Sequence, residues 1–109
     1  MSELEQFVQK LKGVQQIVIN TCHGGFGLSA AGIREYRRLA MVELDNETWC
    51  DRYIKRDDQY LVKVVRELGM SANGPYSNLK IVEIPGDVEW HIEEYDGMEW
   101  VAEDHRTWR

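Results

Sequence analysis

The sequence is poor in the features that mark secreted and metal-binding proteins. Its 109 residues include only two cysteines, Cys22 and Cys50, which lie far apart and form no C-x-x-C pair. Structural zinc sites usually take their ligands in such close pairs, so we expect neither a metal nor any other cofactor. Cysteines of this kind are most simply free thiols in a reducing compartment.

Long apolar runs are also missing, and we expect no targeting leader. No stretch approaches the roughly 18 consecutive apolar residues of a membrane span. The start of the chain, Met1-Ser-Glu-Leu-Glu5, has neither the basic nor the apolar region of a signal peptide. We therefore expect a soluble, cytoplasmic protein without a membrane partner.

Basic residues are outnumbered by acidic ones. The chain holds 13 Lys and Arg against 19 Asp and Glu, which gives a net charge of −6 at pH 7. General nucleic-acid binding is not expected, because contact with a phosphate backbone relies on clustered Lys and Arg. The balance still allows a small anionic ligand that is held by a few local arginines.

The length favours a single domain over residues 1–109. Hydrophobic spacing and capping residues predict helices at 3–12, at 30–40 after Ser29, and at 58–68 between a cap at Asp57 and a terminator at Gly69. A β-branched run predicts a strand at 14–20 that is covered on both faces. A second apolar run predicts a strand at 79–84.

The last part of the chain alternates apolar and polar residues around Asp96-Gly97, which is a strong hairpin signal. This signal predicts that the segment at 99–103 returns antiparallel to the segment at 90–94. We therefore predict an α+β fold, with a small mixed sheet and a C-terminal antiparallel hairpin packed against about three helices.

The most unusual segment follows the first predicted strand, and it runs from Thr21 to Ser29. Its glycines, Gly24, Gly25 and Gly27, permit positive φ and close approach of the backbone to another group. The helix that begins after Ser29 would direct free N–H groups toward a bound anion. The pattern therefore suits a small anionic or nucleotide-like ligand, and it equally suits an ordinary tight turn.

The C-terminal tail adds residues that stack and form hydrogen bonds, which together can hold a planar base or a phosphate. The same tail could instead anchor the last strand to the core. We predict that the ligand-binding residues come from both segments: Thr21, Cys22, His23, Gly24, Gly25, Phe26, Gly27, Ser29, His105, Arg106 and Trp108.

Two other functions remain open from the sequence. Cys22 lies between a strand and a helix start, where thiolates become nucleophiles, and His91 or His105 could serve as its base. The alternative is that Cys22 is a small buried apolar residue, and no catalytic motif is established. The hairpin acids Glu93, Glu94 and Asp96 could instead bind a protein partner, and a homo-oligomer is compatible with either function.

Five segments together resemble a family of small uncharacterised proteins encoded by bacteria, bacteriophages and large DNA viruses. They are Ile19-Asn-Thr-Cys-His-Gly-Gly-Phe-Gly-Leu-Ser29, Arg56-Asp-Asp58, Leu79-Lys-Ile-Val-Glu-Ile-Pro85, Glu94-Tyr-Asp-Gly97 and His105-Arg-Thr-Trp108. The resemblance covers nearly the whole chain apart from the first predicted helix and residues 41–55. It carries over no catalytic role, and it implies an auxiliary viral function such as ligand sequestration during host defence.

Overall fold

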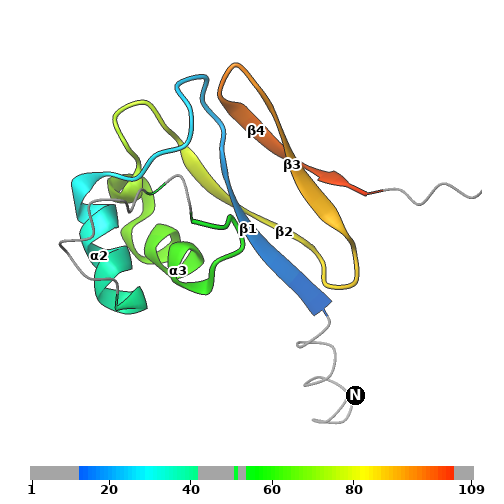
Figure 1. Ribbon diagram of the computed structural model, residues 1–109, viewed down its shortest axis with the longest axis horizontal. Coiled ribbons are helices and arrows are strands. Elements are labelled where there is room, and N and C mark those ends of the chain that lie inside the picture. Colours follow the sequence, from blue (N-terminus) through cyan, green and yellow to red (C-terminus); the bar gives the residue numbers. More distant parts are fainter. Residues whose placement is uncertain (1–12, 42–50, 52–53, 105–109) are drawn as a thin grey trace, which may run out of the picture.

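The computed structural model describes residues 13–41, 51 and 54–104. These residues form a mixed α and β structure in three layers, which confirms the predicted α+β class (Figure 1). In chain order the elements are β1 (Val14–Asn20), α2 (Ala30–Ala40), α3 (Gln59–Leu68), the 3₁₀ helix η2 (Gly69–Ala72), β2 (Leu79–Pro85), β3 (Trp90–Tyr95) and β4 (Met98–Glu103). The helix predicted at 3–12 lies outside the described residues.

The strands form two separate antiparallel pairs. β1 pairs with β2, so that Val14 lies opposite Pro85. β3 pairs with β4 through a turn at Asp96 and Gly97, whose φ angles of 51° and 89° are both positive, as a tight hairpin turn requires. The prediction of one mixed sheet is therefore wrong for the described strands, among which there is no parallel pairing.

The free edge of β1 explains why the two pairs do not join. On this edge the amide of Val18 donates to the carbonyl of Arg56 at 2.8 Å, and the amide of Asn20 donates to the carboxylate of Glu99 at 3.0 Å. Both amides already donate hydrogen bonds, so neither is available to pair with a strand of the hairpin. β4 lies beside β1 without extending its ladder.

The core lies between the β1–β2 pair and the two helices, and the β3–β4 hairpin covers the opposite side (Figure 1). Val18 from β1 and Leu61 and Val64 from α3 are fully buried in this core. Four successive residues of β1, from Ile17 to Asn20, are buried. Because neighbouring residues of a strand point to opposite faces, this burial confirms that β1 is covered on both sides.

Capping residues set the helix ends. The hydroxyl of Ser29 accepts a hydrogen bond from the amide of Gly32 at the start of α2, and Gly69, with a φ of 55°, ends α3. The predicted cap of α3 is wrong by one residue, because Asp58 and not Asp57 accepts the amides of the first turn. None of the described helices is long and apolar enough to cross a membrane.

Candidate functional site

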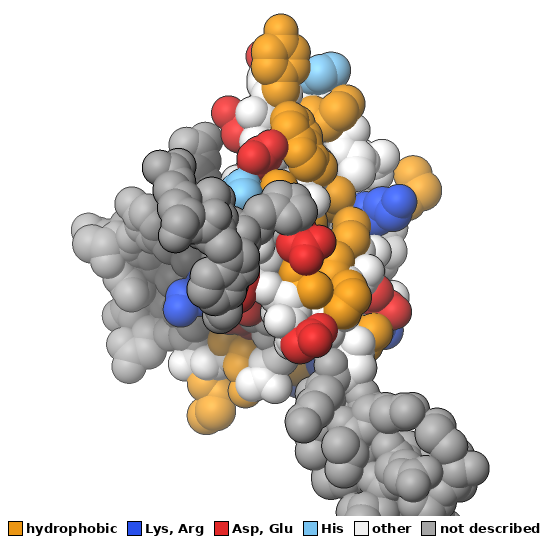
Figure 2. Space-filling view, turned by 90° about the vertical axis from the view of Figure 1, so that its right-hand side faces the viewer, with side chains coloured by type: hydrophobic (Ala, Val, Ile, Leu, Met, Phe, Trp, Pro, Cys, Tyr) orange, Lys and Arg blue, Asp and Glu red, His pale blue; other side chains and the backbone are white. Residues whose placement is uncertain are grey.

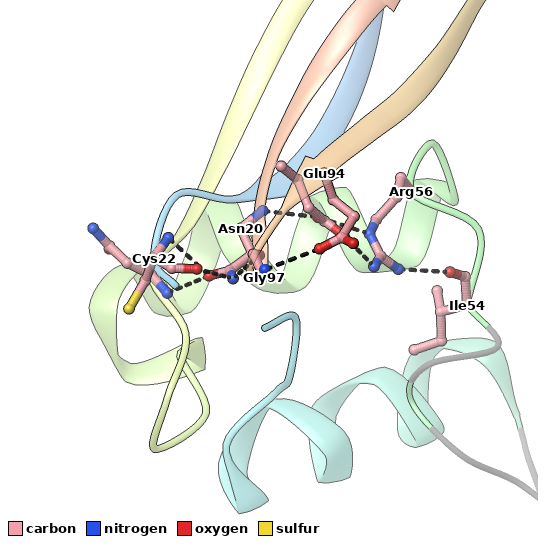
Figure 3. Close-up of polar contacts among 8 residues, drawn as sticks. Asn20, Cys22, Ile54, Arg56, Glu94 and Gly97 are labelled. Carbon is pink, nitrogen blue, oxygen red and sulfur yellow. Dashed lines mark hydrogen bonds and ion pairs between the residues drawn. The ribbon is translucent and has the colours of Figure 1, made fainter. Parts of the chain in front are cut away.

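Three loops meet where β1 ends, and the side chain of Asn20 joins them (Figure 3). This side chain is fully buried. Its Nδ2 donates to the carbonyl oxygens of Cys22 and Gly97 at 2.6 and 2.7 Å. Its Oδ1 accepts the amide of Asn78 at 2.8 Å and that of Cys22 at 3.3 Å. The glycine-rich loop, the hairpin turn and the start of β2 are therefore held by one amide group.

An ion pair lies next to Asn20. Arg56 Nη2 donates to Glu99 Oε2 at 2.8 Å, and Nε donates to Oε1 at 3.3 Å. The two side chains are only 17% and 9% exposed, and the same Oε1 accepts the amide of Asn20. The guanidinium carbon of Arg56 lies 3.6 Å from the centre of the Phe26 ring, in cation–π geometry. The pair thus connects β4, β1 and the loop that carries Phe26.

The guanidinium group of Arg56 retains capacity for a ligand. A guanidinium has five N–H groups, and three hydrogen bonds are formed here, two to Glu99 and one from Nη1 to the carbonyl of Ile54 at 3.4 Å (Figure 3). Two N–H groups are left without a partner in the part of the chain that the structure describes.

The glycines of the loop are explained in part by close packing of the backbone. A Cβ on Gly24 would collide with the carbonyl of Tyr76, and one on Gly97 would collide with the carbonyl of His23. Gly25 also has a positive φ, of 91°, but unlike Gly24 and Gly97 it has open space where a Cβ would be. Close approach between loops therefore requires Gly24 and Gly97, whereas only the backbone angle requires Gly25.

A hollow of about 290 Å³ opens beside these groups. Among the described residues, the amides of Gly24, Gly25 and Phe26 donate no hydrogen bond. Their loop forms one wall of the hollow, and the rest is lined by Arg56, Glu94, Gly97 and Glu99. The carboxylate of Glu94 accepts the amide of Gly97 at 2.9 Å. The hollow therefore brings together free amides, one cation, two carboxylates and an aromatic ring.

The other predicted loop residues have different contacts. The amide and hydroxyl of Thr21 both donate to the carbonyl of Asn78, and the carbonyl of Gly27 accepts the hydroxyl of Ser77. Ser29 caps α2. Of the loop residues predicted to bind a ligand, three thus line the hollow: Gly24, Gly25 and Phe26.

The remaining candidates are dispersed. Cys22 is half-buried, and His23 is exposed with its Nδ1 at 3.9 Å from the carboxylate of Asp96. The predicted residues His105, Arg106 and Trp108 lie outside the described residues.

His91 lies on the hairpin opposite Ala102, and its ring contacts the carboxylates of Glu93 and Asp104. Hydrogen bonds to Glu93 and then to Asp104 raise the pKa of His91 above its usual value. At about 3.3 Å per residue, the strand places His91 roughly 15 to 20 Å from Gly97, near which Cys22 lies. The structure therefore does not bring His91 within reach of the Cys22 thiol.

The charged residues of the hollow were not among the ligand-binding residues predicted from the sequence. Arg56 had a signal, because it belongs to one of the segments that carry the resemblance, as does Glu94. Glu99 had no such signal, since its role depends on an ion pair with a residue 43 positions away. The hollow is thus lined from three parts of the chain that are distant in sequence: residues 24–26, Arg56 and residues 94–99.

Among the described residues, no group of three or more His, Cys, Asp or Glu side chains could hold a metal ion. No protein-family model, curated protein or solved structure matches the chain.

Proposed function

We propose that this chain binds a small molecule with an anionic group, of the size of a mononucleotide or less, in the hollow beside Arg56. The observation that carries the proposal is the guanidinium of Arg56, which has two N–H groups to offer next to the free amides of the Gly24–Phe26 loop. Backbone amides and a guanidinium fork are the groups with which proteins hold carboxylates and phosphates. The volume of about 290 Å³ lies near the lower end of the range for ligand sites.

The charges around the hollow narrow the ligand class. Glu99 already compensates Arg56, and Glu94 adds a second carboxylate to the wall. A ligand that is anionic throughout would be repelled by Glu94. The favoured ligand therefore has two ends: an anionic group for Arg56 and the loop amides, and a hydrogen-bond donor for Glu94. A nucleoside monophosphate, with its phosphate and its hydroxyl or amino groups, meets both requirements.

Titration calorimetry with inorganic phosphate, nucleoside monophosphates and cyclic nucleotides tests this proposal. We expect binding heat from at least one phosphate ester. Inorganic phosphate should bind more weakly, because it lacks the part of the ligand that would donate to Glu94. Gly25→Ala places a methyl group in open space beside the amides. We expect this change to weaken binding about tenfold, the equivalent of about 1.4 kcal/mol.

Gly69→Ala is the matched control. Gly69 also has a positive φ and open space at its Cβ position, but it lies at the end of α3 and does not line the hollow. Both substitutions should cost similar backbone strain, and only Gly25→Ala should change the affinity. Absence of heat with every compound, or equal affinities of the two variants, would contradict the proposal.

A further inference from the structure

The β3–β4 hairpin has an inner and an outer face. Side chains on the inner face contact the rest of the molecule: Trp90 Nε1 donates to Gln15 Oε1 at 2.8 Å, and Glu99 binds Arg56. Because side chains alternate between the two faces of a strand, the outer face carries the other set, namely His91, Glu93, Tyr95, Met98, Trp100 and Ala102. Tyr95 and Trp100 are both exposed on this face, to 72% and 43%.

On this side of the molecule, hydrophobic side chains gather in a band with acidic side chains along it (Figure 2). Residues 88–104 contain seven Asp and Glu and no Lys or Arg. Glu99 is paired with Arg56 on the inner face, whereas Glu93 and Asp104 face solvent on either side of His91. The outer face is thus aromatic and locally acidic, on a chain whose net charge is −6.

We propose that the outer face of the β3–β4 hairpin is a docking surface for a basic segment of another protein. The faces of Trp100 and Tyr95 suit the aliphatic stems and the cationic ends of Lys and Arg side chains. Glu93 lies opposite Trp100, and both Glu93 and Asp104 contact His91 and add negative charge to the same face. A second copy of this chain is a poor occupant, because it would bring the same acidic face and the same net charge.

This surface is separate from the ligand hollow. The hollow is lined by inner-face carboxylates, Glu94 and Glu99, whereas the docking surface uses outer-face residues. Binding of a basic segment therefore neither requires nor excludes a bound small molecule, and the two proposals can fail independently.

Fluorescence anisotropy with a labelled synthetic peptide that alternates Lys and Val tests the docking surface. A peptide with Glu in place of Lys is its control. We expect the basic peptide to bind, with an affinity that falls as the salt concentration rises. We expect the acidic peptide not to bind. We expect the double substitution Glu93→Gln/Tyr95→Thr to lower the affinity for the basic peptide about tenfold, because it removes one charge and one aromatic ring.

The chain offers a matched control, Glu67→Gln/Tyr76→Thr. Tyr76 is 72% exposed like Tyr95, and the Glu67 side chain is 48% exposed like that of Glu93, but neither lies on the hairpin. The control should bind the basic peptide as the unmodified chain does. Equal losses in both double variants, or equal binding of both peptides, would overturn the proposal. So would a dimer in sedimentation that Glu93→Gln/Tyr95→Thr dissociates, since a second copy would then cover this face.

Discussion

At the residue scale, the neighbours of Asn20 fix the orientation of its side-chain amide. The backbone amides of Cys22 and Asn78 can only donate, and the carbonyls of Cys22 and Gly97 can only accept. The oxygen and nitrogen of the side chain therefore cannot exchange places. The group is fully buried, so these hydrogen bonds satisfy polar atoms that water cannot reach.

Asn20→Asp tests this requirement, because it keeps the shape of the side chain and replaces its two N–H donors with a carboxylate oxygen. That oxygen would face the carbonyls of Cys22 and Gly97 without a proton to share. We expect the free energy of unfolding, measured by urea denaturation at neutral pH, to fall by about 3 kcal/mol or more.

Asn73→Asp is the control for this substitution. The side-chain oxygen of Asn73 accepts the amide of Leu79 at 2.9 Å, and its nitrogen makes only a long contact of 3.4 Å to Asn78. An aspartate retains the first of these bonds, so we expect a loss below about 1 kcal/mol. Similar losses at positions 20 and 73 would show that the buried amide has no special role.

At the scale of single elements, the start of α3 depends on Asp58. Its Oδ1 accepts the amides of Tyr60 and Leu61 at 2.8 and 3.2 Å, and its Oδ2 accepts the hydroxyl of Tyr36 at 2.9 Å. Burial, and then the hydrogen bond to Asp58, raise the pKa of Tyr36 to about 12, so this hydroxyl remains a donor. One carboxylate thus caps α3 and connects it to α2.

We expect Asp58→Ala to lower the free energy of unfolding by about 2 kcal/mol, from the lost cap and the lost partner of the Tyr36 hydroxyl. Asp57→Ala is the matched change one residue earlier. Asp57 is exposed and makes none of these contacts, so we expect an effect within about 0.5 kcal/mol. Urea denaturation of the two variants compares the positions directly, and a larger loss at Asp57 would contradict this assignment of the cap.

The same helix shows what local sequence can and cannot predict. Ser29 and Gly69 mark helix ends through groups within a few residues, and both were predicted correctly. Asp57 and Asp58 are equally good capping residues, and the choice between them involves Tyr36, which is 22 residues from Asp58. No pattern confined to a short window contains that contact.

The sheets and the site follow the same rule. Two separate strand pairs arise because Arg56 and Glu99 occupy the free edge of β1, and both are distant from it in sequence. In the candidate site, the glycine-rich segment was conspicuous from its composition, so Gly24, Gly25 and Phe26 could be found. The ion pair could not be found, because Arg and Glu are common on protein surfaces and their burial here results from tertiary packing.

At the scale of the whole molecule, the β3–β4 hairpin is attached to the body at two places. Near its turn, Glu99 binds Arg56 and the amide of Asn20. Near its open end, Trp90 donates to Gln15 on β1. A groove of about 240 Å³ lies at this open end, between β4 and the end of β2. The main core, between β1–β2 and the helices, does not include the hairpin, so we expect the hairpin to open without global unfolding.

Hydrogen exchange in two variants distinguishes such local opening from global unfolding. Glu99→Gln weakens a contact that is lost in both events, so it should speed exchange of the hairpin amides and of the α3 amides alike, by about tenfold or more. Asp58→Ala weakens contacts that are lost only in global unfolding. It should therefore speed exchange in α3 and leave the hairpin amides unchanged.

Glu103→Gln, on the same strand as Glu99 but without an ion pair to a described residue, should alter neither set of amides. Mass spectrometry of peptides that cover 88–104 and 59–68 measures both sets in one sample. If Asp58→Ala accelerates the hairpin as much as α3, the hairpin opens only with the whole molecule, and the two attachments belong to a single cooperative unit. If only α3 responds, the proposed docking surface lies on an element that can open while α3 stays folded.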